Sequence, residues 1–307
     1  MNSKKRIAII GIGGVGGFIG AKLLLSPQTE PVEITFFARG NTFKKIQEKG
    51  LVFESEGKTD VVHPHHLYAK PQGTYDVVII ATKSFSLESA TKEYAGIIGK
   101  HTSVLPLQNM VNAAELIKGI TPDAIVLDGC IYLISNLIKP GHIKHLGGPG
   151  KIITSISPEK NHEWFYRYMN QAGIPIESRA DALQEIWKKF LFISTLGTFT
   201  AACDLSFGDV IKDPQLTQTW IQLMEELALL AQSEGFALGA ADIDHFLSFI
   251  RDFPEAAKSS FQLDVENGRK GEKEFLVDFV IQRSQEKGLD AKTYQKMDLL
   301  INRRLLG

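Results

Sequence analysis

The sequence holds only two cysteines, Cys130 and Cys203, and they lie far apart along the chain. Two distant cysteines favour reduced thiols in a cytosolic protein over a disulfide framework. The chain also lacks a large net charge, because 34 Lys and Arg residues balance 35 Asp and Glu residues. This balance gives no electrostatic reason to bind nucleic acid or an anionic membrane, so we expect neither as a partner.

An uninterrupted hydrophobic run long enough to cross a bilayer is missing as well. The nearest candidate, residues 7–25, follows Lys4-Lys5-Arg6, but six glycines and Lys22 interrupt it. That glycine content lowers the helix propensity too far for a membrane helix or a signal-peptide core. We therefore expect a soluble, cytoplasmic protein. His63, His65 and His66 lack accompanying ligands at metal-binding spacing, so we expect a polar loop there and no metal.

The chain has 307 residues, 44% of them hydrophobic, and a single core stops growing near about 250–300 residues, which favours two domains. Before position 180, strand-like and helical runs alternate. Beyond it, long amphipathic helical patterns replace the strands. We predict strands at 6–10, 32–38, 75–81, 102–106 and 124–128, an edge hairpin or sheet extension at 141–145 and 151–157, and helices at 18–25, 181–202, 241–251, 272–286 and from Pro214, with Asp213 as its cap and Gly235 as its end.

A glycine turn, Gly11-Ile12-Gly13-Gly14-Val15-Gly16, directly follows the first strand. In such a turn Gly11 permits the tight bend, Gly13 lets the backbone approach a pyrophosphate, and Gly16 allows close helix packing. The free amides of the next helix add positive potential. An ordinary structural turn has the same spacing, but the second strand at 32–38 completes the strand, helix, strand order. We therefore predict that all six residues bind a dinucleotide.

The residue after the second strand selects the coenzyme. NAD-binding chains place a carboxylate there for the ribose hydroxyls, whereas this chain has Arg39. A guanidinium grips a 2′-phosphate with two parallel hydrogen bonds, so we predict NADP, used as NADPH. The alternative is an ordinary solvated loop arginine. The predicted fold is an α/β Rossmann-type dinucleotide-binding domain over 1–180, followed by an all-helical substrate and dimerisation domain over 181–307, with the catalytic groups facing the cleft between the two.

Motifs in a fixed order resemble the ketopantoate reductases, the 2-dehydropantoate 2-reductases. These motifs are the glycine turn, Arg39, Ala81-Thr82-Lys83, Gln108-Asn109, His145-Leu146-Gly147, Trp187-Lys188-Lys189, Ser260 and Glu272. The resemblance covers nearly the whole chain. It implies NADPH-dependent reduction of 2-dehydropantoate to pantoate, in the pathway to pantothenate and coenzyme A.

The resemblance also implies roles for single residues. Lys189 matches the catalytic lysine, and an ammonium there would donate the proton that the reduced carbonyl oxygen needs. Lys188, the preceding residue of the same helix, is the alternative candidate for the proton donor. Glu272 matches the acidic partner that favours the charged ammonium, and also a residue of the cofactor site. For Lys189 and Glu272 alike, the alternative is an exposed charge on a helix.

Further residues are implied at the site. Asn109 matches a substrate contact beside the cofactor, and Lys83 matches a cofactor-site lysine. Both follow strand carboxyl ends, where open α/β sheets bind ligands. Ser260 matches the hydroxyl that binds the substrate carboxylate, with helix capping by Ser260 or Ser259 as the alternative.

The chain departs from the family where two asparagines usually follow the lysine, one and two helical turns later. Here those positions hold Ile193 and Gly197, on the same face as Lys189. Ser194 and Thr198 would compensate after a small register shift, so Ser194 is included as a substrate residue. If these two residues do not compensate, we expect a less polar 2-oxo acid as the substrate. The remaining alternative is a non-catalytic regulatory protein that binds NADP. A homodimer is compatible with the apolar helical faces.

Overall fold

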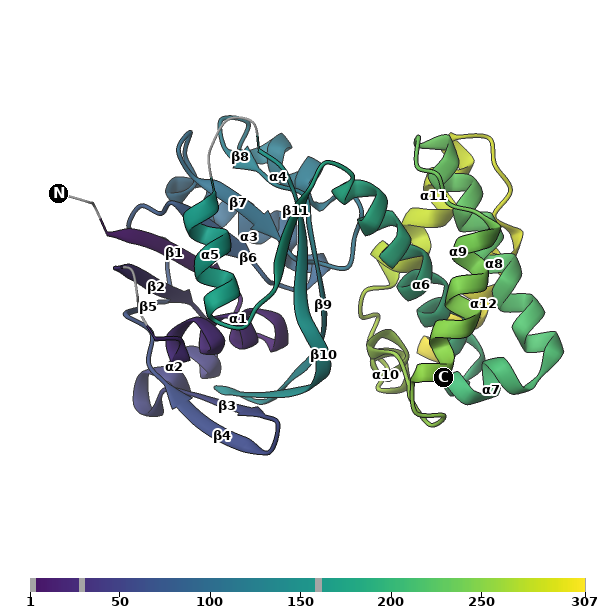
Figure 1. Ribbon diagram of the computed structural model, residues 1–307. Helices are drawn as coiled ribbons and strands as arrows, with labels where there is room; N and C mark the ends of the chain where they lie inside the picture. Colours follow the sequence, from purple (N-terminus) through teal and green to yellow (C-terminus); the bar gives the residue numbers. More distant parts are fainter. Residues whose placement is uncertain (1–3, 28–30, 158–161, 307) are drawn as a thin grey trace. The chain divides into compact units, whose positions relative to one another are not determined.

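The computed structural model describes residues 4–27, 31–157 and 162–306, which belong to two compact units (Figure 1). The first unit runs to Gln108 and continues from Asn112 to Leu183; the second contains Asn109–Val111 and everything from Gln184 onward. We had placed Asn109–Val111 in the first domain and the boundary after residue 180. Within the described residues, no helix is both long enough and apolar enough to cross a membrane.

The first unit is built on a parallel sheet of six strands in the order β5-β2-β1-β6-β7-β8. Its strands are β1 (Lys5–Ile10), β2 (Val32–Phe37), β5 (His66–Tyr68), β6 (Val77–Ile80), β7 (Ser103–Pro106) and β8 (Ile125–Val126). Because β2 and β6 flank β1 on opposite sides, the carboxyl end of β1 is the switch point at which such sheets bind ligands.

Helix α1 (Gly14–Leu25) contacts β1 and β2 of this sheet and also strands of a second sheet. It is apolar around most of its circumference, as expected of a helix covered on both sides. The other helices of this unit are α2 (Gly40–Lys49), α3 (Leu87–Tyr94), α4 (Ala113–Ile120) and α5 (Glu163–Gln171), with short 3-10 turns at Ser84–Ser86 and Ala95–Ile97.

The second sheet corrects our prediction of an edge hairpin on the parallel sheet. Its order is β11-β10-β3-β4, and β9 also pairs with β10. The strands are β3 (Leu51–Ser55), β4 (Lys58–Val62), β9 (Gly129–Lys139), β10 (His142–Ser155) and β11 (Ile176–Arg179). The two short pieces that we expected at 141–145 and 151–157 are one continuous strand, β10, whose pairing with β9 shifts register around its internal glycines.

The described part of the second unit contains helices and no strand, as predicted. Asp213 caps α8 by accepting hydrogen bonds from the amides of Gln215 and Leu216, and Gly235 follows its end with φ +94°. Here α8 packs against α7, α9, α11 and α12 (Figure 1). The helices are α6 (Ala182–Cys203), α7 (Phe207–Lys212), α8 (Pro214–Ser233), α9 (Ala240–Phe249), α10 (Ser260–Glu266), α11 (Phe279–Glu286) and α12 (Lys292–Leu306), with a 3-10 turn at Ile250–Asp252 and a π-helix at Glu274–Asp278. The predicted class, a Rossmann-type domain followed by an all-helical domain, is confirmed.

Candidate active site

The glycine turn closes tightly around the end of β1. Gly11 has φ +91°, a conformation that disfavours side chains, and a Cβ there would lie 2.9 Å from the Thr82 amide nitrogen. A Cβ at Gly16 would lie 2.1 Å from the Gly11 carbonyl oxygen. These two glycines are therefore required by the fold of the turn itself.

Gly13 and Gly14 differ sharply in their surroundings. A Cβ at Gly14 would stand 1.9 Å from the Ser135 carbonyl oxygen of β9, whereas a Cβ at Gly13 would meet no atom within 4 Å. Gly13 therefore leaves an open backbone surface at the start of α1, where helix amides favour an anion. The turn fits a dinucleotide pyrophosphate. Ile12 is buried and offers only its backbone to a ligand, whereas Val15 is half-buried against the core.

Arg39 lies two residues beyond the end of β2 and precedes α2 as its N-cap. Its Nη2 contacts the Glu93 carboxylate at 2.5 Å, and its Cζ lies 5.9 Å from the centre of the Tyr94 ring. Both partners belong to α3. Lys83 is exposed and precedes the short 3-10 turn after β6, so its ammonium remains accessible to an anionic ligand.

Lys189, Asn109 and Glu272 lie together in the second unit. The Lys189 ammonium donates to Asn109 Oδ1 at 3.1 Å, and Asn109 Nδ2 lies 3.5 Å from Glu272 Oε2. The longer contact is at the outer limit of a hydrogen bond. Both contacts orient the Asn109 amide the same way, because an ammonium only donates and a carboxylate only accepts. Asn109 thus links the two charged residues that we predicted as catalytic.

Lys188 takes a different direction from α6. Its ammonium lies 3.0 Å from Asp242 Oδ1, and Asp242 also accepts a hydrogen bond from the Gly239 amide at the start of α9. Consecutive helix residues point about 100° apart, so only one of the two lysines can face Asn109. The register therefore favours Lys189 as the reactive amine.

Glu272 is 5% exposed and is held from both sides along the chain. Before it, Gly271 has φ +54°, and a Cβ there would stand 2.8 Å from the Asp264 side chain. After it, Lys273 pairs with Asp278 at 2.5 Å and with Asp298 at 2.6 Å. Burial lowers the pKa of Lys273, but these two carboxylates outweigh it and raise that pKa, so Lys273 stays charged.

The structure does not bring every predicted residue to this group. Ser194 is fully buried, and its hydroxyl donates to the Leu276 carbonyl at 2.7 Å and lies 2.8 Å from the Tyr294 hydroxyl. Ser194 therefore serves packing, and its assignment to substrate binding is not supported. Ser260 is exposed at the start of α10, whereas the capping role belongs to Ser259, which accepts from the Gln262 amide at 3.0 Å.

The face of α6 that carries Lys189 continues through Ile193 to Gly197. Ile193 is half-buried against the helical core. A Cβ at Gly197 would meet Phe261 and Ser259 only at 3.8 Å, an ordinary contact. Packing therefore does not demand a glycine in the middle of this helix, although glycine costs about 1 kcal/mol of helix propensity relative to alanine.

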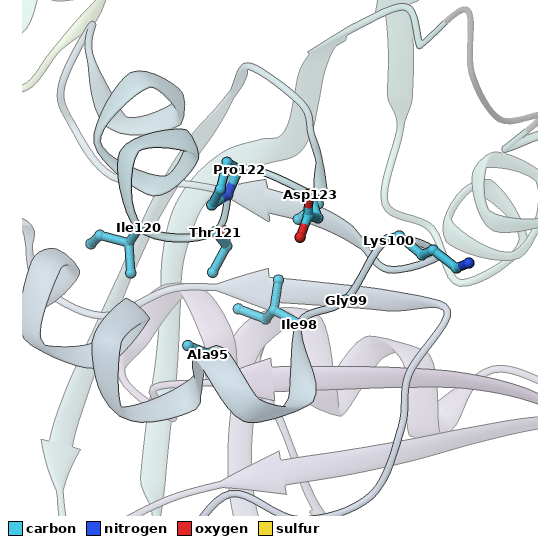
Figure 2. A pocket seen from close by; sticks show the side chains of 9 residues that line it. Ala95, Ile98, Gly99, Lys100, Ile120, Thr121, Pro122 and Asp123 are labelled. Carbon is cyan, nitrogen blue, oxygen red and sulfur yellow. The ribbon is translucent and has the colours of Figure 1, made fainter.

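A cavity of about 490 Å³ lies elsewhere, between the segments 95–100 and 120–124 (Figure 2). These segments precede β7 and β8, so the cavity lies at the amino ends of the strands, opposite the glycine turn. Ligands of open α/β sheets bind at the carboxyl ends, which leaves this cavity outside the candidate site. The predicted polar histidine loop contributes a structural contact, because His65 Nδ1 accepts from the Ile34 amide at 3.0 Å. No cluster of three metal-binding side chains occurs in the ranges described.

Comparison with known families gives matches over most of the chain. The family model described as ketopantoate reductase PanE/ApbA matches residues 7–158, and the model of the C-terminal part of that family matches residues 181–303. A 2-dehydropantoate 2-reductase from Mesorhizobium japonicum is 26% identical over 301 residues, which cover 90% of this chain and 90% of that protein.

Solved structures agree with this result. The 2-dehydropantoate 2-reductase from Porphyromonas gingivalis aligns with a TM-score of 0.82 at 25% identity, over 99% of this chain and all of that one. A D-mandelate dehydrogenase solved with NADH and anilino(oxo)acetate aligns with a TM-score of 0.85 over 98% of both chains. At 19% identity, the second likeness concerns the fold alone.

Proposed function

The chain belongs to the ketopantoate reductase family, and on that premise we propose that it reduces 2-dehydropantoate to pantoate. As a member of this family, the chain is an NADP-dependent oxidoreductase. The choice of substrate is supported by the relatives named 2-dehydropantoate 2-reductase. The reaction would serve pantothenate and coenzyme A synthesis.

Bound NADPH supplies the hydride for the ketone carbon. The glycine turn, Arg39 and Lys83 hold the coenzyme in this proposal, with Asn109 and Glu272 also contributing. Gly13 supports it directly, because a Cβ there would meet nothing and the backbone is open to a pyrophosphate. Charge supports the placement of Arg39 and Lys83, which follow the carboxyl ends of β2 and β6, the two strands that flank β1.

Lys189 is the proposed proton donor. A ketone that gains a hydride develops negative charge on its oxygen, and an ammonium within hydrogen-bond reach stabilises that charge and transfers a proton. Asn109 holds the Lys189 ammonium through its amide oxygen, and Glu272 holds the amide from the other side. This bridged arrangement is the observation that carries the proposal. Ser260, exposed at the start of α10, is the proposed contact for the substrate carboxylate.

The test follows NADPH oxidation with 2-dehydropantoate and with smaller and bulkier 2-oxo acids. Lys189→Ala should lower kcat by about 100-fold or more, the scale of general acid catalysis, while NADPH still binds. Lys188→Ala is the matched control. It removes a lysine of the same helix that pairs with Asp242, and it should leave kcat unchanged. Equal losses in the two variants would contradict the role of Lys189.

A less polar 2-oxo acid is the second candidate, favoured by Ile193 and Gly197. These residues present no amide donors along the face that carries Lys189, and the space beside Gly197 is not required for packing. Losing amide donors to a buried polar substrate costs about 1–3 kcal/mol each. A higher kcat/KM for a bulky apolar 2-oxo acid than for 2-dehydropantoate would favour this candidate. NADPH binding without turnover of any 2-oxo acid would instead indicate a regulator.

A further inference from the structure

Arg39, the residue expected to bind the 2′-phosphate, already has an anionic partner. The Glu93 carboxylate contacts Arg39 Nη2 at 2.5 Å. A guanidinium grips a phosphate through two parallel hydrogen bonds from its nitrogens, so Glu93 occupies one of the donors that the phosphate needs. The two side chains are 58% and 36% exposed, which leaves the ion pair accessible to a solvent-borne ligand.

Glu93 is not the only residue that holds the guanidinium in place. Tyr94 lies beside Arg39, with 5.9 Å between the guanidinium carbon and the ring centre. That ring is 1% exposed and makes an edge contact with Phe37 at 4.9 Å between centroids. Because cations are attracted to the face of such a ring, Tyr94 contributes to the orientation of Arg39 independently of Glu93. What Glu93 adds to the surroundings of Arg39 is a negative charge.

A carboxylate at this place acts in opposite directions on the two nicotinamide coenzymes. It repels the 2′-phosphate of NADPH and competes for Arg39. Toward NADH, which has a hydroxyl instead, a carboxylate is the usual acceptor for the adenosine ribose. We propose that Glu93 is a specificity-determining residue that weakens the preference for NADPH and allows the protein to bind NADH as well. This inference rests on the coenzyme site proposed above.

The test measures the dissociation constants of NADPH and NADH by fluorescence titration in the absence of substrate. Glu93→Gln should tighten NADPH binding by about fivefold, the scale of one unit-charge interaction at roughly 4 Å in water. NADH binding should weaken, because the carboxylate acceptor for the adenosine ribose is lost, and unchanged NADH binding would overturn this part of the inference. Glu88→Gln is the matched control, because it removes the same charge from an exposed pair with Lys92 on the same helix. Neither dissociation constant should change in the control.

A second comparison separates an effect through Arg39 from a general change of charge. In an Arg39→Ala background, Glu93→Gln should tighten NADPH binding less than it does with Arg39 present, because the competition for Arg39 is gone and only the direct repulsion of the phosphate remains. Unchanged or weaker NADPH binding in Glu93→Gln overturns this inference alone, as does an equal gain in Glu88→Gln. Failure of the wild type to bind either coenzyme overturns the proposed coenzyme site together with this inference.

Discussion

Alanine at Gly14 and alanine at Gly13 should separate what the fold requires from what the coenzyme requires. At Gly14 the added Cβ would stand 1.9 Å from the Ser135 carbonyl oxygen. Carbon and oxygen approach to about 3.3 Å, so α1 and β9 would have to part by roughly 1.4 Å. Both are backbone, and no rotamer change relieves the clash. Overpacking of this kind costs about 3 kcal/mol, which lowers the melting temperature of a unit of this size by roughly 6–12 °C.

Gly13→Ala should behave in the opposite way. Gly13 has φ −97° and ψ −158°, which any residue adopts, and its Cβ would meet nothing. Loss of a glycine N-cap costs under about 1 kcal/mol, so the melting temperature should fall by less than roughly 4 °C. The methyl group would stand on the backbone surface that we assign to the pyrophosphate, so the dissociation constant for NADPH should rise at least about tenfold.

The assays are thermal unfolding of the two variants without ligand and titration of each folded variant with NADPH. An equal loss of melting temperature would refute the assigned role of β9 in excluding a side chain at Gly14. Wild-type affinity for NADPH in Gly13→Ala would refute the placement of the pyrophosphate on this turn.

Three other predictions concern the second unit. Ser194→Ala should lower the unfolding free energy by about 1–2 kcal/mol with kcat unchanged, measured by urea unfolding and NADPH oxidation; a selective loss of kcat would restore Ser194 to the site. Lys273→Met should cost about 2 kcal/mol because it leaves carboxylates unpaired, whereas Lys292→Met, in a pair 78% exposed on both sides, should cost under about 0.5 kcal/mol. Burial raises the pKa of Glu234, but the hydrogen bonds and charges of Arg283 and Lys287 outweigh it and hold the pKa below its ordinary value. Glu234→Gln should therefore destabilise by about 1 kcal/mol at neutral pH, and this difference should shrink as the pH falls through the lowered pKa of Glu234, as measured by urea unfolding from neutral to acidic pH; a constant difference would contradict the ion pair.

The parts of the fold that sequence could predict are those with local signals. The buried parallel strands β1, β2 and β6 are short apolar runs, and α8 begins with Asp213-Pro214, a cap followed by a residue suited to the first turn. By contrast, β10 contains Gly147-Gly148-Pro149-Gly150, which read as a turn between two short pieces. Pairing with β9 extends the strand across this segment, and a pairing between two strands leaves no pattern in the sequence of either one.

The candidate site divides in the same way. Lys189, Asn109 and Glu272 were each identified by motif, but their mutual contacts join residues far apart in the chain. Ser194 follows Ile193, which lies on the Lys189 face. One residue along a helix rotates a side chain by about 100°, so the Ser194 side chain turns from that face into the core. Glu93 was missed altogether, since a glutamate on the exposed side of a helix carries no sign of the arginine beside it.

In the proposed reaction, the Lys189 amine protonates the ketone oxygen as hydride reaches the carbon. The most direct measurement is single-turnover oxidation of NADPH already bound to the protein, started by mixing with 2-dehydropantoate. Oxidation should be rapid in the wild type and at least about 100-fold slower in Lys189→Ala, with unchanged affinity for NADPH. Equal single-turnover rates in the two proteins would contradict this role of Lys189.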